Sequence, residues 1–142
     1  MFNYEPYLKS LANFMADNGY TTRPFPKVIL DDTDQGLDVF AKTGYFDPVS
    51  NGVRLFVHNR FPKDVLRTFA HELIHWAQQR SGLLEKSGYT SDKITEDNKL
   101  IKLESEAYLK GNLAFRSWTE TEQKKQTSNK YESTKNKRIT AS

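Results

Sequence analysis

Cysteine is absent from the 142-residue chain, which excludes both a disulfide framework and a metal site built from thiolates. Histidine is scarce, with three residues in the whole sequence. No apolar run reaches the roughly 20 residues that a membrane-spanning helix needs, and the first residues lack the basic and then apolar pattern of a signal peptide. We therefore expect one soluble domain with a modest core, located in the cytoplasm and without a membrane partner.

The surplus of positive charge lies at the C-terminal end of the chain. Residues 1–118 carry 15 basic and 15 acidic side chains, so this part is balanced and lacks the basic stripe that nucleic-acid binding needs. Residues 119–142 carry six basic and three acidic side chains, which accounts for the net charge of +3. We divide the chain at this point into a domain, 1–118, and a basic tail, 119–142.

The tail has few apolar side chains and cannot bury enough apolar area to offset the entropy of ordering. We expect it to be disordered, or at most a frayed extension of the preceding helix. A nucleic acid would bind only here, and a lid over a cleft is the alternative role.

Two of the three histidines belong to one short motif, His71-Glu72-Leu73-Ile74-His75, which has the pattern H-E-x-x-H. Residues four apart on a helix lie on the same face, so His71 and His75 can direct two imidazoles at one ion. Glu72 lies about 100° round the helix, where its carboxylate can take a proton from a metal-bound water. The alternative is a core helix whose two histidines satisfy local hydrogen bonds.

Local signals predict the elements around the motif. Pro62 opens the motif helix, which is expected to run to about Arg80 with Gly82 as its C-terminal cap. A hairpin precedes it, with Asn51-Gly52 in the turn. The other predicted elements are a helix over 4–18, a short buried strand over 28–30, hairpin arms over 39–46 and 53–58, and a second long helix from about 95 to 118.

A catalytic zinc site keeps three protein ligands, and the motif supplies two. The candidates for the third are His58, Glu104 and Glu106. Glu106 lies four residues before Lys110, which suits an ordinary ion pair on a solvated helix face, and this favours Glu104 as the ligand.

The E-x-E-A segment downstream of H-E-x-x-H resembles the glutamate zincins, or gluzincins, whose third ligand is a glutamate on the next helix. The alignment that places Ala107 third after the ligand selects Glu104, and the alternative alignment selects Glu106. The resemblance covers about 53–116, and the order of elements in this region is similar to that of the minimal gluzincins. Tyr108 stands where the family often has an Asp that orients a motif histidine, which is a departure.

The segments 44–48 and 60–67 are also similar to small phage and bacterial metallopeptidase-like proteins. If the chain is encoded by a phage, it is expected in the host cytoplasm or in the virion. The resemblance implies an α+β, zincin-like fold with a small antiparallel or mixed sheet, a motif helix and a glutamate helix. In such zincins the strand just before the motif helix commonly lies at the edge of the cleft and pairs with an extended substrate.

The resemblance further implies a metalloprotease that holds Zn²⁺ through His71, His75 and Glu104 and hydrolyses peptide or protein substrates. Glu72 would be the catalytic base of this endopeptidase. Donors to the developing oxyanion are sought among His58, Tyr89, Tyr108 and Arg116. Two alternatives remain: a DNA-associated metallopeptidase of the SprT-like kind, and a non-catalytic zinc-binding or virion structural protein. The oligomeric state is open.

Overall fold

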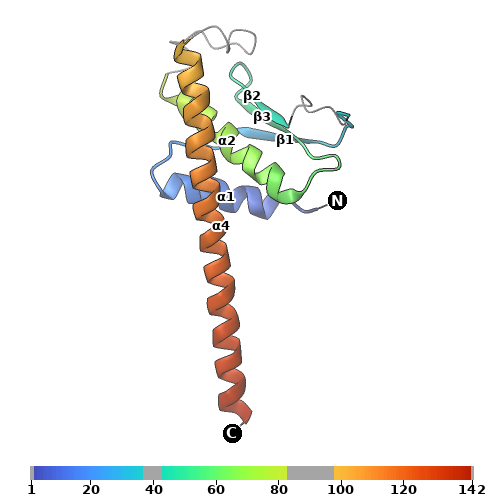
Figure 1. Cartoon of the computed structure of the whole chain (residues 1–142), viewed down its shortest axis with the longest axis vertical. Coiled ribbons are helices and arrows are strands. Elements are labelled where there is room, and N and C mark those ends of the chain that lie inside the picture. The colour runs from blue at the N-terminus through green and yellow to red at the C-terminus, as the bar shows by residue number, and fades with distance from the viewer. Residues whose placement is uncertain (1, 37–42, 83–97, 142) are drawn as a thin grey trace.

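The computed structural model of the chain describes residues 2–36, 43–82 and 98–141, and within the last helix it describes side chains from Leu100 to Gln126. The described part is an α+β structure in which three helices accompany a small mixed sheet (Figure 1). Its elements are α1 (Glu5–Asp17), β1 (Lys27–Asp31), β2 (Gly44–Asp47), β3 (Gly52–Phe56), α2 (Pro62–Arg80) and α4 (Asn98–Ala141). The α+β class predicted from the sequence is confirmed.

The three-stranded sheet has the order β1-β3-β2, so β3 is its central strand. It pairs in parallel with β1 and antiparallel with β2, where Phe46 lies opposite Val53. Asn51 adopts a positive φ of 55° in the β2–β3 turn, the conformation that asparagine tolerates better than most residues. The predicted hairpin is therefore confirmed over the described residues, while the start of its first arm lies outside them.

Two expectations about the strands are wrong. The strand over 28–30 was expected to be buried, but β1 lies at the edge of the sheet, and Ile29 and Leu30 are 37% and 38% exposed. The strand directly before the motif helix was expected to lie at the edge of the cleft, but that strand, β3, is the central one. The edge strand β2 lines the cleft instead, and the hairpin places it beside β3 on the side opposite β1.

The core lies between the sheet and the helices. The apolar face of α1 is buried through Leu11 and Met15, as its helical periodicity predicted. It packs against α2, which also packs on β2 and β3. The Trp76 indole N–H donates to the carbonyl oxygens of Thr22 and Pro24, each at 3.0 Å, and so joins the segment before β1 to the motif helix.

The motif helix α2 spans Pro62–Arg80, the bounds predicted from its sequence. Pro62 stands in the first turn, where its missing N–H removes no helical hydrogen bond. Gly82 has a φ of +78°, the left-handed conformation that glycine adopts just after a helix. These local signals agree with the fold, so the motif is presented on a regular helix.

The last helix, α4, runs for 44 residues, about 66 Å at the usual rise per residue. The expected end near Trp118 is wrong, because the backbone stays helical to Ala141. No glycine or proline follows Gly111, so the sequence contains no strong helix breaker there. Of the two expectations for residues 119–142, helical extension describes the backbone, while the division of the chain at residue 118 stays a prediction.

The first third of α4 packs against α2, the most extensive contact between elements in the described structure. Its C-terminal part extends away from the body rather than across the motif helix (Figure 1). This course gives no support to a lid formed by the tail. Within the described ranges, no helix combines the length and the apolar character that a membrane crossing would require.

Candidate metal centre

Helix α2 presents both motif histidines on one face. The centroids of the His71 and His75 rings lie 5.0 Å apart in an edge-on arrangement. The His75 side chain is 2% exposed and that of His71 is 15% exposed, so both rings are largely shielded from water. The four-residue spacing thus produces the convergence that the motif predicted.

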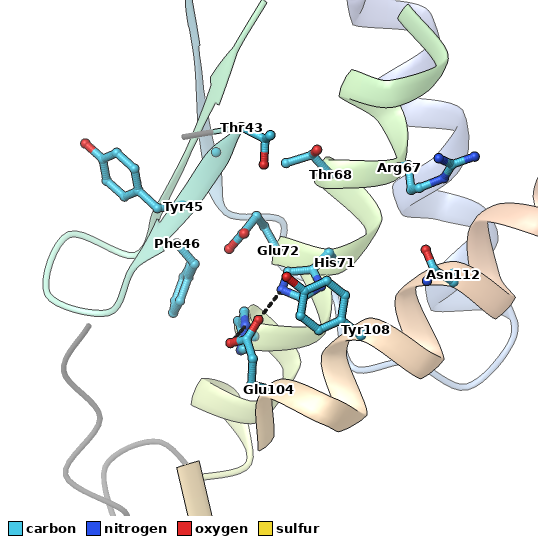
Figure 2. A pocket seen from close by; sticks show the side chains of 12 residues that line it. Thr43, Tyr45, Phe46, Arg67, Thr68, His71, Glu72, Glu104, Tyr108 and Asn112 are labelled. Atoms are coloured by element: carbon cyan, nitrogen blue, oxygen red, sulfur yellow. Dashed lines mark ion pairs between the residues drawn. The ribbon is translucent and has the colours of Figure 1, made fainter. Parts of the chain in front are cut away.

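Helix α4 brings a carboxylate to these two rings. One oxygen of Glu104, Oε1, lies 2.8 Å from His71 Nε2, and the other, Oε2, lies 3.0 Å from His75 Nε2 (Figure 2). One ligand atom from each of the three residues lies within 4.8 Å of the others. His71, His75 and Glu104 could therefore hold a metal ion, in the combination preferred from the sequence.

The other two ligand candidates lie elsewhere. The Glu106 carboxylate lies 3.5 Å from Lys110 Nζ, the ion pair that its i,i+4 spacing suggested. His58 Nδ1 lies 3.5 Å from a carboxylate oxygen of Asp32, and His58 does not line the cleft. Neither residue belongs to the group of metal-ligating side chains found in the described structure.

The spacing of the ligand atoms fits a small metal ion. Around a tetrahedral zinc with bonds of about 2.0–2.1 Å, ligand atoms are separated by roughly 3.3–3.4 Å. The ligand-atom separations here run from 2.8 Å to at most 4.8 Å, so the side chains would have to adjust by about 0.5–1.4 Å to enclose the ion. Burial alone would raise the pKa of Glu104, but hydrogen bonds from the two imidazoles outweigh it and lower the pKa to about 2. The carboxylate is therefore ionised at neutral pH, as a metal ligand must be.

Gln78 orients His75 from behind. Its side-chain amide is buried, with Nε2 donating to the Leu103 carbonyl oxygen at 2.9 Å and Oε1 lying 2.9 Å from His75 Nδ1. Because the NH₂ group faces the carbonyl, the amide oxygen must accept from Nδ1–H. This places a proton on Nδ1 and directs Nε2 toward Glu104, the arrangement that an imidazole ligand needs.

The supporting role of Gln78 was not predicted from the sequence. The signal available was its i+3 spacing from His75, which puts both side chains on one face of the helix. Tyr108, at the place where the family often has an orienting Asp, instead packs its ring against His71 with centroids 4.4 Å apart. The chain thus lacks the orienting Asp at position 108, and Gln78 orients His75 instead.

Gly111 lets the two helices approach closely at the site. A Cβ added here would lie 2.9 Å from His71 Cα and 3.0 Å from His71 N. Any larger residue would meet backbone rather than a flexible side chain. Gly111 is seven residues, or two turns, from Glu104, so this contact helps to set how far the Glu104 carboxylate stands from the histidines.

Glu72 lies on the side of His71 that faces β2 (Figure 2). The residue is 6% exposed, and its carboxylate accepts a hydrogen bond from the Phe46 backbone N–H. Burial raises the pKa of Glu72 above its ordinary range, and the nearby His75 and His71 oppose this effect only in part. A raised pKa makes a carboxylate a stronger base, which suits a group that must accept a proton near neutral pH.

A cleft of about 520 Å³ opens over these residues. Its walls come from β2, α2 and α4, so three elements that are distant in sequence meet there. Three lining residues that the sequence analysis did not single out are Arg67, Thr68 and Asn112.

Among the oxyanion-donor candidates in the described residues, Tyr108 lines this cleft, whereas His58 and Arg116 do not. Tyr89 lies outside the described residues.

Comparison with known proteins adds no relative. The chain matches no protein-family model, no curated protein and no solved structure. The likeness to gluzincins therefore rests on the two motifs, and the case for a function rests on the geometry of the cleft.

Proposed function

We propose that the protein is a zinc-dependent metallopeptidase with a zincin-like fold. The observation that carries the proposal is the convergence of His71, His75 and Glu104 beside the buried carboxylate of Glu72. A purely structural zinc site is usually closed by four protein ligands and has no use for a separately held carboxylate beside a set of three. This combination favours peptide hydrolysis over the non-catalytic alternative.

The choice of zinc follows from the donor set. Two imidazole nitrogens and one carboxylate oxygen are the ligands of many catalytic zinc sites, which keep one position open. When bound, zinc would supply a Lewis acid that lowers the pKa of a coordinated water toward about 7. The His₂Glu set differs from the three-histidine pattern of the SprT-like alternative, and no described residue favours that class.

Glu72 would act as the general base. It is held by the Phe46 N–H rather than joined to the ligand cluster, so its carboxylate can receive a proton from the attacking water and deliver it to the leaving amine. The raised pKa of Glu72 supports the second of these transfers, because a stronger base holds the proton until the amine needs it.

Tyr108 would stabilise the developing oxyanion. Its hydroxyl points toward the part of the cleft that holds His71 and Glu72 (Figure 2), and its ring packs on His71. A donor placed there can hydrogen-bond to charge that grows on the substrate carbonyl oxygen. Tyr108→Phe should lower kcat by about 10²–10³-fold and leave metal affinity unchanged.

The substrate would be an extended peptide or a segment of a protein. Within the described structure, β2 pairs with β3 on one side only, and its other side faces the cleft. An extended chain laid along β2 would pass over the ligand residues.

The proposal is tested by metal analysis together with digestion of a peptide library. Wild-type protein should contain about one zinc per chain and cleave peptides, and Glu72→Gln should keep the zinc while losing about 10²–10⁴-fold in rate. The matched control is Glu106→Gln, which changes an acid outside the cleft and keeps a side-chain oxygen that can accept the 3.4 Å hydrogen bond from Gln78 Nε2. Wild-type protein that binds zinc tightly but cleaves nothing would refute the proposal and leave the non-catalytic function.

A further inference from the structure

Arg67 provides a fixed positive charge in the cleft. Among the described lining residues, the two carboxylates already have tasks, because Glu104 belongs to the ligand set and Glu72 is the proposed base. Arg67 takes no part in either task. A guanidinium beside a peptide-binding site is suited to bind a carboxylate of the substrate through two parallel hydrogen bonds.

The position of Arg67 relates it directly to the reacting atoms. It precedes His71 by four residues on α2, so the two side chains are neighbours on one face of the helix, with Cβ atoms about 5–6 Å apart. Figure 2 shows Arg67 one turn from His71, on the side of α2 that faces Asn112. An extended peptide advances about 3.3 Å per residue, so Arg67 can reach a group one or two residues from the cleaved bond.

The Arg67 guanidinium is held in place but keeps donors to offer. Its Cζ lies 5.4 Å from the centroid of the Phe115 ring, an arrangement in which the planar cation stacks on an aromatic face. One nitrogen, Nη1, lies 3.5 Å from a carboxylate oxygen of Asp64, at the long end for an ion pair. Guanidinium has five N–H donors, so this single contact leaves most of them for a ligand.

A second cavity of about 390 Å³ adjoins the cleft through the shared lining residues Arg67 and Asn112. Lys63 and Arg116 also line this cavity, whereas Glu120 is its one acidic lining residue among the described ones. Glu120 lies 3.2 Å from Arg116 Nε and so offsets that cation. With Asp64 also 3.5 Å from Arg67 Nη1, this end of the cleft has three cations, Lys63, Arg67 and Arg116, against two nearby carboxylates, and so keeps a net positive charge.

We propose that Arg67 is a specificity-determining residue that selects substrates with a carboxylate within about two residues of the cleaved bond. This inference rests on the proposed peptidase function. The carboxylate belongs either to an Asp or Glu side chain or to the C-terminus of the peptide, since both present the same planar group to the guanidinium. Asn112, which lies on α4 across the helix interface from Arg67, can donate a further hydrogen bond to this carboxylate.

The test uses fluorescent peptides built on a sequence that the library digest shows to be cleaved. The two residues before and the two residues after the cleaved bond are varied one at a time, with Glu in one peptide and Gln in its twin. A further pair of truncated peptides ends within two residues after the cleaved bond, one as a free acid and the other as an amide. Binding is measured by anisotropy with zinc-loaded Glu72→Gln protein, which holds peptide without cutting it. Cleavage is measured as kcat/KM with Glu72 intact.

At one position or terminus, the acidic peptide should bind about tenfold or more tightly than its neutral twin, as expected for a charge-assisted hydrogen bond. In Arg67→Gln this preference should fall below about threefold, with zinc affinity unchanged. Lys9→Gln removes an exposed cation on α1, away from the cleft, and should keep the full preference. Which twin pair responds distinguishes a side chain from a C-terminus.

Three results separate the outcomes. Cleavage without any acidic preference in wild type would overturn the role of Arg67 while leaving the peptidase function intact. A preference that persists in Arg67→Gln would move recognition to another residue and also overturn it. Zinc-loaded wild type that neither cuts nor binds any peptide would refute the peptidase function itself, and the inference with it.

Discussion

Substituting Gly111 with alanine should separate the two helices that build the candidate metal centre. The new Cβ would lie 2.9 Å from His71 Cα, whereas carbon atoms in contact are normally about 3.5–4.0 Å apart. Because the obstructing atoms are helix backbone, α4 must move by about 0.6–1 Å at this point. Ligand constellations tolerate about 0.5 Å, so Glu104 should no longer meet both histidines well.

Two effects of the same substitution oppose each other in the free energy of unfolding. Alanine is favoured over glycine inside a helix by about 0.5–1 kcal/mol, whereas an overpacked contact costs about 1–3 kcal/mol. The net result should be a loss of about 1–2 kcal/mol. Zinc affinity should fall about 10–100-fold, the range seen when support of a metal ligand is disturbed.

The assay is chemical denaturation of the metal-free protein together with zinc competition against a chelator of known affinity. Lys110→Ala is the matched control, because it changes a half-exposed neighbour on α4 whose ion-pair partner, Glu106, lies on the same helix. If Gly111→Ala instead stabilised the fold and bound zinc as wild type does, the helices would not approach as closely as described.

The remaining predictions concern the ligands and their protonation. Zinc affinity should fall by more than about 100-fold in Glu104→Gln and by about 10–100-fold in Gln78→Leu, and it should change negligibly in Glu106→Gln. The reverse ranking of the two glutamate variants would make Glu106 the metal ligand. The shifts of Glu104 and His75 favour stability of the metal-free protein between about pH 4.5 and 6.5, and the raised pKa of buried Glu72 moves the maximum toward the lower end of this window, because ionising that carboxylate costs stability. As pH falls below this window toward the folded pKa of Glu104, about 2, the carboxylate is protonated and its contribution to the free energy of unfolding is lost. As pH rises above the window, His75 loses its proton and its contribution is lost, because its partners raise its pKa despite burial. Denaturant midpoints at about pH 3, 5.5 and 9 in chelator check this, and a stability that rises steadily with pH would contradict it.

The motif helix could be predicted from the sequence because its determinants are local. Pro62 at the start, Gly82 after the end and the i,i+4 spacing of His71 and His75 all act within one helix. The same reasoning gave the hairpin turn at Asn51-Gly52, since φ preferences belong to single residues. The α+β class was expected from the family resemblance, and the helical and alternating apolar periods of the predicted helices and strands agree with it.

Strand order could not be read in the same way. The apolar run of β1 has the composition of a buried strand, but whether a strand lies at the centre or at an edge depends on which partners the rest of the chain supplies. Here the hairpin places β3 between β1 and β2, so β1 stays half-exposed and β2 borders the cleft. The end of α4 was misjudged for the opposite reason, because a polar composition that disfavours burial does not by itself break a helix.

The sequence by itself determined that two imidazoles and a carboxylate share one helix, because that geometry is intrinsic to a turn of 3.6 residues. The choice of Glu104 over Glu106 was favoured from spacing, but only the tertiary structure places one beside the histidines and the other beside Lys110. That placement depends on how α4 is rotated and how closely it approaches α2, which Gly111 permits. Contacts between helices are set by packing over the whole interface, and no local pattern encodes them.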